Sequence, residues 1–301
     1  MGWGAPRVAS APEVIGVFGP TASGKSAVAE NVAGRLGTEV VSADAMQVYR
    51  GLPILTNQPD RPTRLVAIRE PSEEMSVAEY AALAHAAIDE LVDRAGSAVV
   101  AGGTGLYFRA ALAELDVPPA PTPGARERLQ LVYDRDPAYA HARLAAVDPE
   151  AATRVHPNDR RRVVRALELA EMGSSIVPKH SQLWSDAVRR PALVVGLDLR
   201  PDVLEQRIRE RASSMVARGL LEEVQATRSL PLSRTAEKAL GLRELGELPL
   251  AAALERLVVR TIRYAAYQRK WMRRIPGIVM IDADDSPEML ADAILEVART
   301  R

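Results

Sequence analysis

The sequence predicts an α/β fold in which a parallel sheet is flanked by helices and carries a small helical insertion. Short apolar runs alternate with helical patterns, and a glycine-rich loop joins the first apolar run to the first helical pattern. A proline-rich stretch then interrupts the series. Alternating strands and helices build parallel sheets through right-handed crossovers. The chain is long enough for one large domain or two modest ones.

The predicted elements follow from the hydrophobic pattern. Apolar residues at helical spacing predict a helix from Lys25 to Leu36 and an alanine-rich, amphipathic helix from Val77 to Arg94. Beyond residue 198 the chain is mostly helical until a final apolar run. The short apolar runs predict strands at 13–19, 39–42, 97–101, 192–198 and 277–281.

A linker and an insertion divide the chain. The stretch from Val117 to Gly124 is too rich in proline for a helix or a central strand. From Ala125 to about Gly173 the pattern is helical, with breaks near Pro149 and Pro157. We therefore predict an α/β core of residues 1–117 and 191–301, and a helical insertion domain of residues 118–190.

Composition narrows the class of protein. Hydrophobic residues make up 47% of the chain, which excludes a disordered protein, and no apolar run approaches the ~18 residues of a membrane helix. The lack of cysteine excludes disulfides and thiolate metal sites, and the four histidines stand too far apart to suggest a metal cluster. No signal-peptide pattern opens the chain. We expect a cytoplasmic protein without membrane contact.

The segment from Gly19 to Ser26 matches the pattern G-x-x-x-x-G-K-[ST] completely. It follows a predicted strand and opens a predicted helix, as a phosphate-binding P-loop requires. Its backbone N–H groups and the helix N-terminus attract a polyphosphate, Lys25 adds a charge, and the Ser26 hydroxyl could hold Mg²⁺. The motif predicts a P-loop NTPase-like sheet, without saying which phosphate is bound. The predicted ligand residues are Gly19, Thr21, Ala22, Ser23, Gly24, Lys25 and Ser26.

Two further segments follow strands at their carboxyl ends, where open α/β sheets bind ligands. Asp44 is either an active-site carboxylate or the N-cap of a helix, and Gln47 could hydrogen-bond a base edge. The segment 102–105 holds three glycines around Thr104. It either brings the backbone close to a ligand or forms a tight turn capped by Thr104. Position alone leaves both pairs of alternatives open.

Basic residues cluster in two places, although the formal net charge is zero. The segment from Arg256 to Arg274 holds seven cations and no acid, and Arg160, Arg161, Arg162 and Arg165 form a second cluster. A run of charges is ordinarily a solvated helix face. Tyr264, Tyr267 and Trp271 are interleaved with the cations of the C-terminal segment, which makes RNA contact the alternative; the family resemblance described next, which reaches this segment, favours it.

These motifs, in this order and spacing, resemble those of the tRNA dimethylallyltransferase (isopentenyltransferase, or IPP transferase) family. G-P-T-A-S-G-K-S, S-A-D-A-M-Q-V-Y-R-G and G-G-T-G-L-Y-F stand at 19–26, 42–51 and 102–108. Residues 156–168 resemble the family's H-P-N-D-x-x-R-x-x-R-A-L-E, and residues 261–273 resemble its T-[RK]-x-x-A-[KR]-R-Q-x-x-W-[FM]-R. Shorter matches extend the resemblance over about residues 13–275.

The resemblance implies a reaction and a role for each motif. A dimethylallyl group would move from its diphosphate to the N6 amine of the adenosine 3′-adjacent to the anticodon of a tRNA. Asp44 would be the base, Thr104 would steady the diphosphate or the amine, and Lys25, with Mg²⁺ at Ser26, would stabilise the departing diphosphate. The enzyme would be a monomer whose partners are dimethylallyl diphosphate and the anticodon stem-loop. The implied tRNA contacts are Gln47, Arg160, Arg161, Arg165, Arg263, Gln268 and Arg269.

Some positions depart from the family's pattern. Leu55–Pro59 lacks the lysine of a G-T-A-K-P-like stretch, and Thr63–Glu70 replaces an H-H-x-x-D stretch. Leu242, Ile262 and Ala266 replace an aromatic residue and two cations, which bears on tRNA affinity. Three alternatives therefore stay open: an isopentenyltransferase for free adenine nucleotides, a P-loop nucleotide kinase, and a non-catalytic RNA-binding relative.

Overall fold

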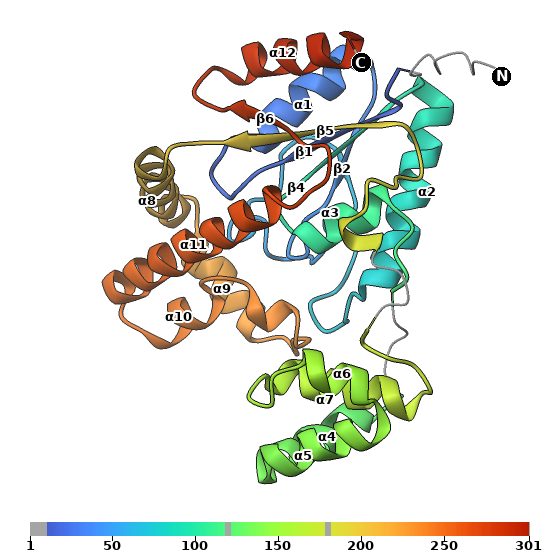
Figure 1. Ribbon diagram of the computed structural model, residues 1–301. Coiled ribbons are helices and arrows are strands. Elements are labelled where there is room, and N and C mark those ends of the chain that lie inside the picture. The colour runs from blue at the N-terminus through green and yellow to red at the C-terminus, as the bar shows by residue number, and fades with distance from the viewer. Residues whose placement is uncertain (1–10, 118–121, 178–181, 301) are drawn as a thin grey trace, which may run out of the picture. The chain divides into compact units, whose positions relative to one another are not determined.

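The computed structural model describes residues 11–117, 122–177 and 182–300 and divides the chain into two compact units (Figure 1). The larger unit combines Met1–Glu114 with Leu183–Arg301, and the smaller unit is Leu115–Gln182. The chain rejoins the larger unit at Leu183, earlier than residue 191, because the buried Arg109 side chain binds the backbone there. Its guanidinium donates to the carbonyl oxygens of Leu183 and Ser185, each at 3.0 Å.

The larger unit is built on a six-stranded parallel sheet in the order β3-β2-β4-β1-β5-β6. All residues of β1 are buried, which suits a central strand covered on both faces. The predicted α/β fold class is confirmed. The strands are β1 Val14–Phe18, β2 Val40–Ser42, β3 Thr63–Arg64, β4 Ala98–Gly102, β5 Ala192–Asp198 and β6 Val279–Asp282.

The sequence did not predict β3, which is an edge strand of only two residues. Thr63 and Arg64 pair with Val40 and Val41 of β2. Arg64 also forms ion pairs with Glu39 and Glu90, each at 2.7 Å. A strand this short has no hydrophobic alternation to detect.

Helices cover both faces of the sheet (Figure 1). α1 (Lys25–Leu36), α8 (Pro201–Ala217) and α12 (Pro287–Thr300) share one core cluster with the sheet, around Val17 and Val195. On the opposite face, Phe108 of α3 meets Phe18 edge-on, with 5.1 Å between ring centroids. The other elements of this unit are α2 Val77–Ala95, α3 Gly105–Leu112, α9 Leu220–Arg228, α10 Leu242–Glu247, α11 Leu250–Met272 and η2 Ala236–Lys238, with η1 Gln182–Trp184 at its boundary.

The smaller unit is helical and has a core of its own. Leu129, Leu144 and Leu167 are each at most 1% exposed within it. Asp136 and Asp148 cap two of its helices through their carboxylates, and a proline follows each cap. Its helices in the described residues are α4 Ala125–Arg135, α5 Pro137–Val147, α6 Pro149–Arg154 and α7 Arg160–Glu171. The predicted breaks at Pro149 and Pro157 are observed, with a further break at Pro137. Within the described part of the chain, no helix combines the length and apolarity needed to cross a membrane.

Candidate active site

The phosphate loop lies between β1 and α1, as its pattern predicts. Ala22 and Gly24 adopt positive φ angles of 64° and 86°, which turn the backbone tightly before α1 begins at Lys25. The loop packs closely at Gly19, where a Cβ would approach Ser23 Oγ to 2.6 Å and the Leu197 carbonyl oxygen to 3.1 Å. The loop therefore directs the N-terminus of α1, with its free N–H groups and positive potential, toward one place.

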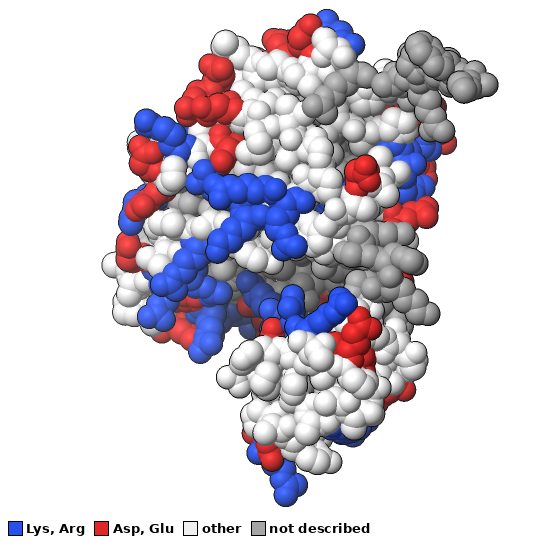
Figure 2. Space-filling view, viewed as in Figure 1, with Lys and Arg blue, Asp and Glu red and all other residues white. Residues whose placement is uncertain are grey.

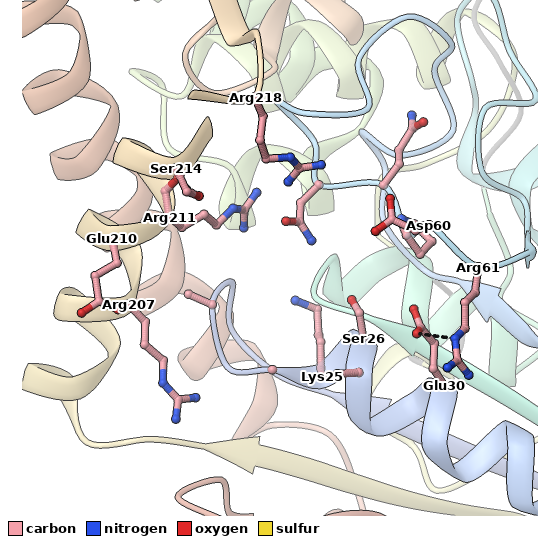
Figure 3. Close-up of a pocket in the computed structure, with 16 residues that line it drawn as sticks. Lys25, Ser26, Glu30, Asp60, Arg61, Arg207, Glu210, Arg211, Ser214 and Arg218 are labelled. Carbon is pink, nitrogen blue, oxygen red and sulfur yellow. Dashed lines mark hydrogen bonds and ion pairs between the residues drawn. The ribbon is translucent and has the colours of Figure 1, made fainter. Parts of the chain in front are cut away.

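That place is a cavity of about 700 Å³ between the phosphate loop, the segment 57–61 and α8 (Figure 3). Figure 3 shows Lys25 and Ser26 facing Arg211 and Arg218 across it. Cations outnumber acids in its wall, which suits an anionic ligand. The charged lining residues are Lys25, Arg61, Arg207, Arg211 and Arg218, against Glu30, Asp60 and Glu210.

Arg211 and Lys25 are half-buried cations that line this cavity. Arg211 Nη1 donates to Thr21 Oγ1 (2.9 Å), while its Nε, buried, has no partner among the described residues. The pKa of Lys25 is lowered to about 8, chiefly by burial; Asp44 opposes this change and Arg211 contributes to it. Two half-buried cations without an ion-pair partner among the described residues carry uncompensated charge, which a bound polyphosphate would neutralise.

Asp44 lies at the end of β2 and interacts electrostatically with both Lys25 and Arg211. Its Oδ1 accepts a hydrogen bond from the Met46 N–H (2.9 Å), but turns follow it and α2 begins only at Val77. The helix-cap interpretation is therefore wrong. Asp44 does not itself line the cavity, but lies close enough to act on the cations that do.

The second glycine turn is packed against α11, and its glycines make room for protein groups. A Cβ on Gly102 would overlap the Ala43 carbonyl, one on Gly103 would overlap the amide of Gln268, and one on Gly105 would overlap the Trp271 ring. Thr104 begins α3 without a side-chain cap bond. Its Oγ1 accepts from the Ala45 N–H (3.2 Å), which ties this turn to the one after Asp44.

We expect Gly102→Ala to destabilise the protein by about 2–3 kcal/mol, because a methyl group there meets rigid backbone. Gly34→Ala is the matched control: Gly34 lies on the exposed face of α1 with nothing within 4 Å of the new Cβ. That change should add about 0.5–1 kcal/mol of stability. Chemical denaturation of both variants measures the difference, and equal stabilities would contradict the close approach.

Two glutamines expected at the RNA have protein partners in the structure. Gln47 Oε1 accepts from Ser42 Oγ (2.8 Å), and Gln47 Nε2 donates to the Asn57 carbonyl (2.7 Å), so this side chain holds the segment that forms one cavity wall. Gln268 is only 2% exposed and bridges the phosphate loop to the second glycine turn. Contact of either glutamine with tRNA stays a prediction.

The predicted basic contacts differ in how freely they can bind RNA. Arg160 forms an ion pair with Asp134 (2.6 Å), and Arg269 forms one with Asp198 (2.8 Å). Arg165 pairs with the buried Glu168 carboxylate (3.0 Å). Arg161 and Arg263 are exposed, and neither forms an ion pair within the ranges that the structure describes.

Sequence analysis missed the cationic face of α8. Arg207 and Arg211 are four residues apart and line the cavity together, with Arg218 just after the helix. Their spacing was a possible signal. Acidic neighbours such as Glu205 and Glu210 concealed it, because alternating charges are typical of a solvated helix.

The sheet, the phosphate loop and the cationic cavity define a P-loop-like α/β protein whose cavity suits an anionic ligand. Family models agree on which class: one described as IPP transferase matches residues 47–275, and one described as isopentenyl transferase matches residues 12–68. A tRNA dimethylallyltransferase of Anaeromyxobacter dehalogenans is 43% identical, covering 91% of this chain and 96% of that protein. The chain belongs to the IPP transferase family, and the resemblance predicted from its motifs is confirmed.

Other relatives and solved structures are similar along nearly the whole chain. The tRNA dimethylallyltransferase of Geobacillus kaustophilus is 36% identical over 96% of both proteins. The crystal structure of the tRNA isopentenylpyrophosphate transferase of Bacillus halodurans has a TM-score of 0.67 at 30% identity, covering 96% of this chain and 95% of that one. A eukaryotic dimethylallyltransferase acting on tRNA has a TM-score of 0.71 at 26% identity, covering 90% of this chain and 74% of that one.

Proposed function

We propose that this protein transfers a dimethylallyl group from dimethylallyl diphosphate to the N6 amine of the adenosine 3′-adjacent to the anticodon of a tRNA. The observation that carries the proposal is the placement of Asp44 close enough to interact with two half-buried cations, Lys25 and Arg211, which line the cavity at the phosphate loop. This arrangement supplies a proton acceptor next to a site for an anionic leaving group. Its setting in an IPP transferase chain supports that particular pair of substrates.

In this mechanism the N6 nitrogen attacks the allylic carbon, the carbon–oxygen bond to the diphosphate breaks, and Asp44 accepts the amine proton. Lys25, Arg211 and the N-terminus of α1 hold the diphosphate and stabilise the charge that grows as it leaves. Thr104, tied to the turn after Asp44, would steady the diphosphate or the amine. The adenine must leave its stack, which costs least in a single-stranded loop.

Ser26 fits the magnesium role that its position in the motif predicts. Its hydroxyl lines the cavity beside Lys25, and the described residues contain no group of three or more histidine, cysteine or acidic side chains that could enclose a metal. Mg²⁺ is commonly held by one or two protein ligands together with water and substrate phosphates. When bound, Mg²⁺ would supply further stabilisation of the diphosphate charge.

The exposed side of α11 is the proposed RNA contact. Arg263, Tyr267 and Lys270, spaced by four and three residues, are exposed on one helical face, which we name the basic stripe. Figure 2 shows Lys and Arg side chains gathered over the region of α11. Tyr267 is 55% exposed and offers a ring on which a base can stack between the two cations.

The proposed function is tested by offering the purified protein dimethylallyl diphosphate and Mg²⁺ with either unmodified tRNA or AMP. We expect N6-dimethylallyladenosine in digested tRNA by mass spectrometry, and its loss from tRNA of a deletion strain. Equal modification of AMP would favour a nucleotide isopentenyltransferase. Phosphoryl transfer from ATP without prenylation would favour a nucleotide kinase and overturn the proposal.

The basic stripe makes a separate prediction for RNA affinity. Replacing Arg263 and Lys270 by alanine should weaken binding of an anticodon stem-loop and lower the slope of log affinity against log salt by about 0.7 for each lost phosphate contact. Diphosphate binding should not change. Fluorescence anisotropy across a salt series measures the slope, with Arg299→Ala on α12 as the control for loss of an exposed cation. An unchanged slope would place the RNA elsewhere.

A further inference from the structure

The buried side-chain amide of Gln268, on α11, hydrogen-bonds to both loops of the site. Its Oε1 accepts from the Thr21 N–H (2.8 Å) of the phosphate loop. Its Nε2 donates to the Gly103 carbonyl (2.9 Å) in the turn that carries Thr104. Each partner is remote in sequence, 247 and 165 residues away respectively.

The chain of hydrogen bonds continues on either side of this amide. On the side of the cavity, where dimethylallyl diphosphate would bind, Thr21 Oγ1 accepts a hydrogen bond from Arg211 Nη1 (2.9 Å). On the side of the Thr104 turn, Tyr264, one helical turn before Gln268, interacts with the side chains of both Thr104 and Gln268. The amide therefore joins the cation that faces the diphosphate to the turn that lies beside Asp44.

The backbone around Gln268 is shaped to hold it in this position. A Cβ on Gly103 would overlap its Nε2 and approach the Gly19 carbonyl oxygen to 2.9 Å. Because the Thr21 N–H is donated to Gln268, it is not available to a phosphate, and the loop's ligand-binding donors must come from later residues. The amide thus fixes the register of the phosphate loop without lining the cavity.

We propose that Gln268 is a positioning residue, which holds the donor's diphosphate and the acceptor's amine at the distance and angle that transfer requires. The inference rests on the proposed transferase function. Reacting atoms must be held near 3–3.5 Å, and a displacement of about 1 Å can lower the rate about 10²-fold. Each substrate would still make its own contacts with the protein without this amide. Loss of the amide should therefore lower the rate of transfer and leave substrate binding unchanged.

The first test replaces Gln268 by methionine, which keeps the side chain's length and removes both hydrogen bonds. We expect kcat to fall about 10- to 100-fold. The KM values for dimethylallyl diphosphate and tRNA, and the affinity for inorganic pyrophosphate, should change little. Gln225→Met, at an exposed position of α9, is the matched control for the loss of a glutamine amide. A wild-type kcat in Gln268→Met would overturn the inference, and inactive wild-type protein would overturn the proposed function itself.

The second test is a pH profile of the kcat of Gln268→Glu. A residue with a merely structural role would not give a pH-dependent kcat when replaced in this way. A protonated carboxyl has one donor and one acceptor, as an amide does, whereas an ionised carboxylate has only acceptors and faces the Gly103 carbonyl unfavourably. The ratio of the variant's kcat to the wild-type kcat should therefore rise as pH falls.

The ratio separates this effect from other titrations in the site. Lys25, Asp44, Arg211 and Tyr264 face this region from α1, the β2 turn, α8 and α11, and they are present in both proteins. Their contributions largely cancel in the ratio. A ratio that stays flat with pH, in a variant that melts at the wild-type temperature, would overturn the positioning role.

Discussion

Replacing Asp44 by asparagine should lower kcat about 10²- to 10⁴-fold, which is the usual contribution of a positioned base. The amide of asparagine cannot accept the proton of the adenine amine at neutral pH. The turn should survive, because the Asn Oδ1 can still accept the hydrogen bond that the Met46 N–H donates to Asp44 Oδ1 (2.9 Å). Single-turnover transfer from labelled dimethylallyl diphosphate to tRNA measures the effect.

Two controls separate loss of the base from loss of the fold. Anticodon stem-loop affinity should stay near that of the wild type because the basic stripe lies on another element, and pyrophosphate should still bind because Asp44 is not in the cavity wall. Asp284→Asn, at an exposed carboxylate after β6, should leave kcat unchanged. Full activity in Asp44→Asn would show that the proton is taken by another group, and the mechanism would have to change.

The second large effect is expected at Lys25. Lys25→Met should lower kcat about 10²- to 10³-fold, because a positioned donor at a charge-developing oxygen is worth about 3–4 kcal/mol. Lys25→Arg keeps the charge but not the shape, and should retain part of the activity. RNA affinity should be unaffected in both, because the basic stripe lies on another element. If Lys25→Met weakened binding of dimethylallyl diphosphate but left kcat unchanged, Lys25 would contribute to substrate binding and not to stabilising the transition state relative to the bound substrate.

The pH dependence of donor binding follows from the same residue. Lys25 has a pKa of about 8 in the free protein, so it loses its charge as pH rises through 8. A bound diphosphate favours the charged lysine, hence binding above pH 8 should take up a proton and weaken with rising pH. Calorimetry of pyrophosphate binding in two buffers of different ionisation enthalpy measures the uptake. In Lys25→Met the uptake should vanish; its persistence would assign the proton to another group.

The parts of the site that local patterns predict are those whose residues are close together in sequence. The phosphate loop from Gly19 to Ser26 has its glycines, lysine and helix start within one turn, so its chemistry is visible without a fold. Asp44 and Thr104 are each the second residue after a strand, and parallel strands place their carboxyl ends at one edge. The five longer strands were visible for the same local reason.

Other residues changed meaning once the chain was folded. Gln268 matched a motif associated with RNA, yet its amide lies between two loops that the sequence places far away. The glycines of the second turn suggested access for a ligand, but they accommodate Gln268, Trp271 and the Ala43 carbonyl. Gln58, which stands where a lysine is usual, donates to the carbonyl oxygens of Gln47 and Tyr49 and so still ties down the cavity wall.

The amino-acid order alone settles the α/β class, the phosphate loop and the family, because each depends on short-range periodicity or on contiguous residue types. It does not reveal the cationic wall from α8 or the bridge through Gln268. Arg211 reaches Thr21 across 190 residues of sequence, and Gln268 reaches it across 247. Contacts between residues so far apart in sequence arise from strand order and helix packing, which produce no periodic pattern in the sequence. They become visible only in the folded structure, where the sheet brings α1, α8 and α11 together.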